Sequence, residues 1–119
     1  MKKLKIIGGG LAGSEAAWQA AERGVQVDIF EMRPYVNTGA HITSNFAELI
    51  CSNSLGSNLT YKASGLLKEE LRMLGSLLIK CADKSSVPAG GALAVYRNDF
   101  AKMVTKHLKE HNNINIFRK

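Results

Sequence analysis

Residues 4–15 decide the fold, and they read Leu-Lys-Ile-Ile-Gly-Gly-Gly-Leu-Ala-Gly-Ser-Glu. The apolar run before the glycines predicts a strand over residues 4–7, and the alanine-rich sequence after them predicts a helix over residues 11–23. Gly8, Gly10 and Gly13 have the spacing G-x-G-x-x-G. In this motif the first glycine permits a tight turn, the second lets the backbone approach a pyrophosphate, and the third lets the helix pack close to the strand.

The residues that follow complete a βαβ unit. Gly24 stands where a helix C-cap is expected, residues 25–30 alternate as in a strand, and Glu31 follows at the strand tip. A carboxylate there accepts hydrogen bonds from an adenosine ribose, which favours FAD or NAD, although Arg33 could suit the 2′-phosphate of NADP. The sequence therefore predicts an α/β, Rossmann-like fold with a parallel sheet. The predicted cofactor-binding residues are Gly8, Gly9, Gly10, Leu11, Ala12, Gly13, Glu31 and Arg33.

The chain is short for such a fold. Its 119 residues allow one domain at most. A dinucleotide-binding sheet usually has about five or six strands, whereas three good strands are found here, at residues 4–7, 25–30 and 114–117. We therefore expect residues 1–119 to be the N-terminal part of an FAD/dinucleotide-binding domain, with the remainder of the enzyme absent.

Composition narrows the class of protein. The formal net charge is +6, and Lys102, Lys106 and Lys109 are part of the basic excess, which fits either RNA attraction or an ordinary solvated helix face. No apolar run is long enough for a membrane span, and the N-terminus enters a strand at once, which argues against a signal peptide. Cys51 and Cys81 fit neither C-x-x-C nor zinc-site spacing. We expect a cytoplasmic protein without a structural metal.

The middle of the chain is harder to interpret. Residues 35–61 lack periodicity, and we expect an ordered loop near the cofactor, with a short helical turn over residues 46–50 capped by Thr43 or Ser44. Leucines at 67, 71, 74 and 78 predict one helix over residues 65–80 with its stripe in the core. Residues 87–95 predict a loop and a short strand, and Asn98 is expected to cap a second amphipathic helix.

Five side chains are candidates for chemistry. Cys51 lies in a polar segment and could be a nucleophile or a redox partner, although a small buried residue has the same signature. Cys81 ends an amphipathic helix and is expected to be structural. His41 could reach a substrate phosphate or a flavin, or be a solvated loop residue. His107 and His111 are one helical turn apart, but no third ligand joins them, so a solvated helix end is favoured over a metal site.

Several longer strings together resemble one family, the folate- and FAD-dependent tRNA (uracil-5-)-methyltransferases known as TrmFO. They include the glycine string at residues 8–18, Glu-Met-Arg-Pro at 31–34, Ala-His-Ile-Thr at 40–43 and Phe-Ala-Glu-Leu-Ile-Cys-Ser-Asn-Ser-Leu at 46–55. Residues 65–72, residues 87–95 and Arg97 extend the resemblance over essentially the whole chain. The strings around Cys51 and Pro88 are the more specific, because many flavoproteins share the glycine motif.

The resemblance implies a reaction and its reagents. Methylenetetrahydrofolate would donate one carbon, reduced FAD the electrons, and NAD(P)H would reduce the flavin, giving 5-methyluridine in the T-loop of tRNA. Cys51 would either attack carbon 6 of uracil or assist flavin and proton chemistry while another thiol attacks, because it matches one of the catalytic cysteines of the family. The other would lie past Lys119, because the family protein is several times longer, and Tyr96 stands where an acid is expected before Arg97. Two rivals stay open, a related flavoprotein that modifies the tRNA wobble uridine and a non-catalytic dinucleotide-binding module.

Overall fold

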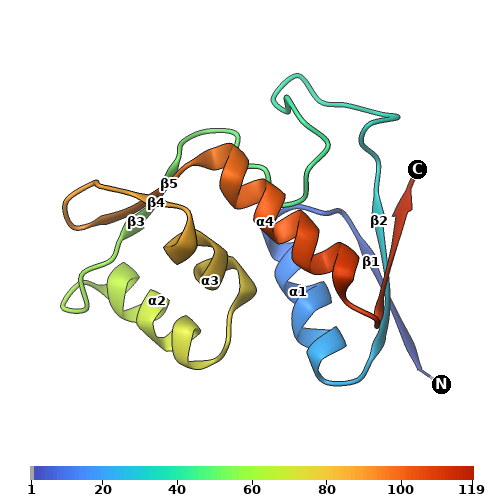
Figure 1. Ribbon diagram of the computed structural model, residues 1–119, viewed down its shortest axis with the longest axis horizontal. Helices are drawn as coiled ribbons and strands as arrows, with labels where there is room; N and C mark the ends of the chain where they lie inside the picture. Colours follow the sequence, from blue (N-terminus) through green and yellow to red (C-terminus); the bar gives the residue numbers. More distant parts are fainter. Residues whose placement is uncertain (1) are drawn as a thin grey trace.

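A parallel sheet with two helices on one face forms the first part of the molecule (Figure 1). The computed structural model describes residues 2–119. Strand β1 (Lys3–Ile7), helix α1 (Leu11–Glu22) and strand β2 (Gln26–Glu31) form the predicted βαβ unit. Helix α4 (Arg97–Glu110) returns the chain to strand β6 (Ile114–Arg118), and the sheet order is β1-β2-β6 with all neighbours parallel. The predicted parallel α/β arrangement is confirmed.

The core lies between this sheet and its helices. Val27 and Ile29 of β2 and Ile114 of β6 face the helices because alternate strand residues point to the same side. The helices contribute small or apolar side chains to the same core: Ala17, Ala21, Phe100, Val104 and Leu108. The alanines let α1 lie close to the sheet, as the sequence predicted.

Two glycines of the motif have the conformations that their predicted roles require. Gly8 has φ +100°, a left-handed conformation that glycine adopts without strain, and it makes the turn at the end of β1. A Cβ on Gly13 would lie 1.9 Å from the carbonyl oxygen of Gly8, so only glycine allows α1 to start this close to β1. Both predicted roles are confirmed.

A second sheet lies beside the first unit. It is antiparallel, with the order β3-β5-β4, and it consists of β3 (Ser54–Ser57), β4 (Ser86–Val87) and β5 (Ala92–Val95). Helices α2 (Ala63–Met73) and α3 (Leu77–Lys84) pack beside it (Figure 1). The sequence predicted β5 but not β3, whose Ser-Leu-Gly-Ser sequence carries little strand signal, nor the two-residue β4.

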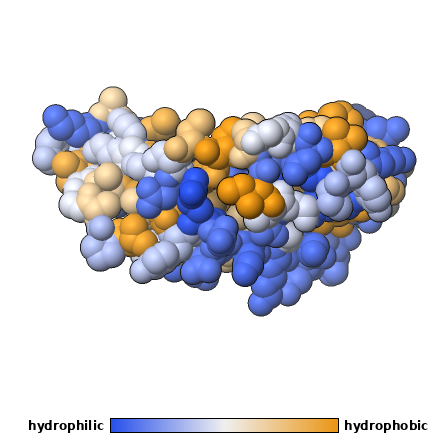
Figure 2. Space-filling model, turned by 90° about the horizontal axis from the view of Figure 1, so that it is seen from above, coloured by the Kyte–Doolittle hydropathy of each residue, from blue (hydrophilic) through white to orange (hydrophobic). Residues whose placement is uncertain are grey.

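The predicted single helix over residues 65–80 is wrong, because the chain breaks between α2 and α3. Gly75 has φ +79°, and the Ser76 hydroxyl accepts a hydrogen bond from the Ile79 amide at 3.2 Å, which caps α3. The break also overturns the predicted core stripe. Leu67 and Leu74 are 55% and 70% exposed, while Leu77 is buried. Seen from above, the surface of the molecule mixes hydrophobic and hydrophilic side chains (Figure 2).

Two smaller predictions also fail. Residues 46–50 hold a turn at Phe46 and Ala47 but no helix, because side-chain contacts rather than a helical ladder hold this backbone. Helix α4 starts after Tyr96, so Asn98 lies inside its first turn and is not the cap. The apolar face predicted for α4 is confirmed by the burial of Phe100, Val104 and Leu108. Within residues 2–119 no helix is long and apolar enough to cross a membrane.

Candidate functional site

The glycine loop borders a cavity of about 290 Å³ at the carboxyl end of β1 and β2. Five of the predicted cofactor-binding residues meet there: Gly8, Gly9, Gly10, Glu31 and Arg33. The other three, Leu11, Ala12 and Gly13, form the first turn of α1 directly behind it. His41 also lines the cavity, which the sequence offered as one of two alternatives for this residue.

The start of α1 is open toward an anion. Gly10 precedes the helix as its N-cap, and within the described chain no side chain caps this end and no acidic residue stands in its first turn. The first amides of a helix have no partner inside the helix, and the N-terminal end carries partial positive charge. A Cβ on Gly10 would meet no atom of residues 2–119 within 4 Å. The loop therefore offers bare amides beside open space, the arrangement that binds phosphate groups.

Glu31 places an ionised carboxylate in the wall of the cavity. Its Oε2 accepts from the Gly9 amide at 2.9 Å, and its Oε1 accepts from the Arg33 amide and Nε at 3.0 and 2.9 Å. Burial favours the neutral form, but the hydrogen bonds from Arg33 and Gly9 outweigh it and lower the pKa of Glu31 to about 2. The carboxylate is thus charged at neutral pH and oriented by the glycine loop.

Arg33 is buried, and its guanidinium donates four hydrogen bonds to groups of the protein. Besides Glu31, its guanidinium donates to Oε2 of Glu48 at 2.9 Å and to the carbonyl oxygens of Thr43 and Asn45 at 3.1 Å each. Only 3% of its side chain is exposed. These contacts occupy the donors of the guanidinium within the protein, so the geometry gives no support to a 2′-phosphate site. Arg33 instead anchors the irregular segment, residues 32–53, to the end of β2.

The irregular segment closes over the glycine loop through Phe46, as expected for an ordered loop near the cofactor. A Cβ on Gly9 would lie 2.2 Å from the Phe46 ring, so the ring fills the space that only a glycine leaves. The Ala47 amide donates to the Gly9 carbonyl at 2.9 Å, and the Phe46 amide donates to the Thr105 hydroxyl at 2.8 Å. The guanidinium carbon of Arg118 lies 4.6 Å from the Phe46 ring centroid. Phe46 is one of the apolar residues that favoured an ordered, packed segment here.

Cys51 is exposed and lines a second, open pocket of about 560 Å³ with Ser52, Asn53, Val95, Tyr96 and Arg97. The alternative that Cys51 is a small buried residue is therefore wrong. Asn53 fixes the segment, because its carbonyl accepts from the Val95 amide at 2.9 Å and its side-chain amide donates to the Val95 carbonyl at 3.2 Å. Cys81, in contrast, is fully buried, and burial raises its pKa to about 11, which confirms its structural role.

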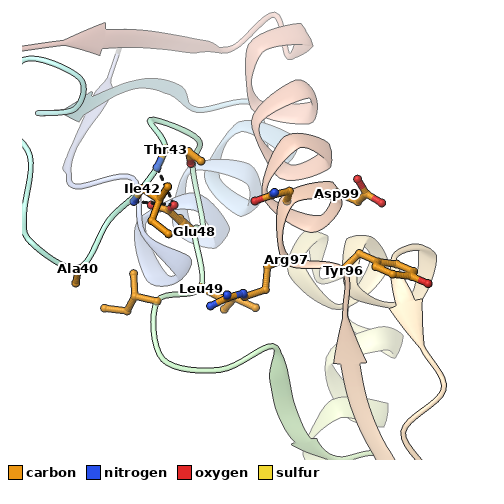
Figure 3. A pocket seen from close by; sticks show the side chains of 10 residues that line it. Ala40, Ile42, Thr43, Glu48, Leu49, Tyr96, Arg97 and Asp99 are labelled. Carbon is orange, nitrogen blue, oxygen red and sulfur yellow. Dashed lines mark hydrogen bonds between the residues drawn. The ribbon is translucent and has the colours of Figure 1, made fainter.

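A third pocket, of about 470 Å³, adjoins the cysteine pocket and is shown in Figure 3. Tyr96 and Arg97 line both pockets. In this view Arg97 extends toward Leu49, whereas Tyr96 points away. Glu48 borders the third pocket, where its Oε1 accepts from the Ile42 and Thr43 amides at 3.1 and 2.9 Å. The buried chain of ion pairs from Glu31 through Arg33 to Glu48 therefore links the wall of the glycine cavity to the wall of the third pocket.

The histidines of α4 have a structural explanation. The rings of His107 and His111 contact the edge of Trp18, with centroids 5.7 and 5.2 Å away, and His111 Nε2 lies 2.8 Å from Glu22. The predicted solvated helix end is therefore wrong, because both rings pack against α1. Within residues 2–119 no three His, Cys, Asp or Glu side chains are grouped as a metal site would need.

Solved structures share this fold. The Aquifex aeolicus GidA structure superposes with a TM-score of 0.76 at 19% identity, over 98% of this chain and 19% of that one. The GidA-related protein from Thermus thermophilus gives 0.51 at 16% identity, over 97% of this chain and 37% of that one. At such identities the likeness concerns the fold alone.

Sequence relatives are much closer. A protein of Exiguobacterium sibiricum named methylenetetrahydrofolate–tRNA-(uracil-5-)-methyltransferase TrmFO is 62% identical over 98% of this chain, and one of the same name from Rubrobacter xylanophilus is 58% identical over all of it. The chain spans about a quarter of the length of these relatives, 27% in both cases. The resemblance drawn from the sequence strings is thereby confirmed. The family model described as glucose inhibited division protein A matches residues 3–119, and the chain belongs to that family.

Proposed function

We propose that residues 1–119 form the N-terminal, FAD-binding part of a tRNA (uracil-5-)-methyltransferase that uses methylenetetrahydrofolate. One observation carries the proposal. A single chain combines an open glycine cradle with an exposed cysteine in a separate pocket, and its relatives at 57–62% identity bear this enzyme's name. Because the chain covers about a quarter of those relatives, the activity belongs to the full-length protein.

The residues at the glycine cavity fit an adenine dinucleotide such as FAD. The amides at the start of α1, from Gly10 to Gly13, would hold the pyrophosphate, and the ionised Glu31 would accept hydrogen bonds from the ribose. His41 lies in the wall of the same cavity. When bound and reduced, FAD supplies the two electrons that convert a methylene group to a methyl group, and NAD(P)H would restore them.

Cys51 is the group of this chain that we assign to chemistry on uracil. Carbon 5 of uracil is a poor nucleophile. Addition of a thiolate at carbon 6 forms an S–C6 bond and an enolate, and the enolate attacks the one-carbon unit through carbon 5. Loss of the carbon 5 proton then expels the thiolate and restores the ring double bond. The one-carbon unit is still bonded to a folate nitrogen at this point, and that C–N bond breaks when the carbon receives a hydride equivalent, so tetrahydrofolate leaves as the methyl group forms. Arg97 lines the same pocket and brings a positive charge to the place where the enolate would form.

Two other functions are less favoured. A flavoprotein acting on the tRNA wobble uridine shares the family, but the relatives at 57–62% identity are named as uracil-5-methyltransferases. A non-catalytic module would not need an exposed cysteine held beside Arg97 by the Asn53 contacts. The proposed partners are tRNA, the folate and a nicotinamide dinucleotide, and the proposed compartment is the cytoplasm, where free thiols persist.

The test compares the two cysteines in the full-length protein. Cys51→Ala should keep FAD and the fold but reduce formation of 5-methyluridine in undermodified tRNA by orders of magnitude, because the thiol chemistry is lost. Cys81→Ala is the matched control and should keep activity per folded molecule, because its thiol is buried away from the pocket. A Cys51→Ala variant with more than about a tenth of the wild-type rate, a barrier change under roughly 1.4 kcal/mol, would contradict the assignment.

A further inference from the structure

Three lysines form a row on the outer face of α4. Lys102, Lys106 and Lys109 follow one another at i, i+4 and i+7, and all three are exposed. The opposite face of the helix is buried against the core through Phe100 and Leu108. At 1.5 Å rise per residue, the row spans about 10 Å along the helix axis.

The row keeps most of its charge unpaired. Lys106 lies 4.0 Å from Glu110, and both side chains are about two thirds or more exposed, at 71% and 67%, so that pair contributes little. Among residues 2–119, Lys102 and Lys109 have no ion pair. A surface groove of about 490 Å³ runs at the base of the row, lined also by Asn45, Thr105 and Glu110. Three ammonium groups against one carboxylate make this groove a cationic surface.

The row leads away from the pocket that contains Cys51. Arg97, which lines that pocket, is the first residue of α4, and the lysines follow it 5, 9 and 12 residues later. Along the helix axis these intervals correspond to about 8, 14 and 18 Å. One helix therefore carries a cation at the cysteine pocket and, on a different face about 120–180° around its axis at 3.6 residues per turn, three more along its length.

We propose that this row, defined as Lys102, Lys106 and Lys109, binds the sugar–phosphate backbone of the RNA whose uridine enters the Cys51 pocket. An enzyme that modifies a base in folded RNA must bring the base out of its stack, and backbone contacts beside the pocket hold the RNA in register while this happens. Charge complementarity identifies the occupant as a polyanion, and that the RNA is tRNA rests on the function proposed above.

The test measures how the affinity for undermodified tRNA depends on salt. In the full-length protein, Lys102→Gln, Lys106→Gln and Lys109→Gln are combined in one variant. A matched control combines Lys62→Gln, Lys80→Gln and Lys84→Gln, which remove three exposed charges from α2 and its surroundings and from α3. The row variant should lower the slope of log K against log salt by about 2 to 3, because that many phosphate contacts are lost. Binding should be at least about tenfold weaker near 0.1 M salt and equal to wild type near 1 M.

Each outcome bears on one claim. Unchanged slope in the row variant, or an equal fall in both triple variants, would overturn the proposal, since the latter would reflect net charge alone. The FAD content and the formation of 5-methyluridine at saturating tRNA are measured in the same samples. Wild-type protein that binds tRNA through the row but makes no 5-methyluridine would contradict the proposed reaction and leave the row in place.

Discussion

The βαβ unit over residues 3–31 and the irregular segment over residues 32–53 build the two sides of the glycine cavity by different means. The first is held by ladder hydrogen bonds and by apolar packing of Val27 and Ile29. The second has no helix or strand within the described chain, and individual side chains hold it. The side chains of Arg33 and Glu48 form hydrogen bonds with its backbone, and the Phe46 ring packs against Gly9.

The difference shows how a cavity can be assembled from two unlike parts. We call residues 3–31 the rigid half and residues 32–53 the tethered half. Ladder hydrogen bonds and apolar packing fix the position of the glycine loop at the end of β1. The irregular half depends on one buried guanidinium that contacts both carboxylates, Glu31 in the rigid half and Glu48 in the tethered half. A few specific substitutions should therefore separate the two halves.

The largest loss of stability is expected from Arg33→Met. The variant leaves Glu31 and Glu48 buried without their partner, which costs about 3–5 kcal/mol when a buried pair is broken. Hydrogen exchange in the full-length protein should show loss of protection at the Ile42, Thr43, Phe46 and Ala47 amides, with residues 3–31 little changed. Arg72→Met is the control, because the pairs of Arg72 with Glu69 and Asp83 are partly exposed and worth about 1 kcal/mol or less. An equal loss of protection in the two variants would contradict the claim that Arg33 holds the irregular segment in place.

A smaller effect, on the rigid half, is expected from Gly13→Ala. Its new Cβ would lie 1.9 Å from the Gly8 carbonyl oxygen, so α1 must shift, at a cost of roughly 1–3 kcal/mol. Gly10→Ala is the matched control, since its Cβ enters open space within the described chain. Thermal unfolding should separate them, with a lower Tm for Gly13→Ala alone. A wild-type Tm for Gly13→Ala would show that the helix does not depend on this close approach.

The same comparison explains what the sequence could predict. The rigid half was predicted element by element, because glycine spacing and apolar alternation are local signals, and β6 and the apolar face of α4 followed from the same kind of pattern. The tethered half was not, since the partners of Arg33 lie up to fifteen residues away and leave no periodic trace. The break at Gly75 was missed because the leucine spacing continues across it. The start of α3 is capped by the adjacent Ser76 and by Glu15, which belongs to the distant helix α1.

In the candidate site, too, local sequence patterns predicted some features, and contacts between distant segments determined others. The sequence predicted Gly8, Gly9, Gly10, Glu31 and Arg33 as cofactor-binding residues. All five line one cavity, but the guanidinium of Arg33 donates to protein groups. Cys51 could be interpreted from spacing either as buried or as reactive, and its exposure beside Arg97 depends on the pairing of Asn53 with β5. Such pairing joins segments more than forty residues apart and has no local sequence signal.

The flavin content of the full-length protein tests the central claim, that the glycine loop of this chain is a cofactor cradle, most directly. Gly10→Val fills the open space beside the first amides of α1 without touching any described atom within 4 Å at its Cβ, so the fold should persist. Purified wild-type protein should show the absorption bands of bound FAD, and the Gly10→Val protein, with an unchanged Tm, should lack them. Equal flavin stoichiometry in both proteins would contradict the claim.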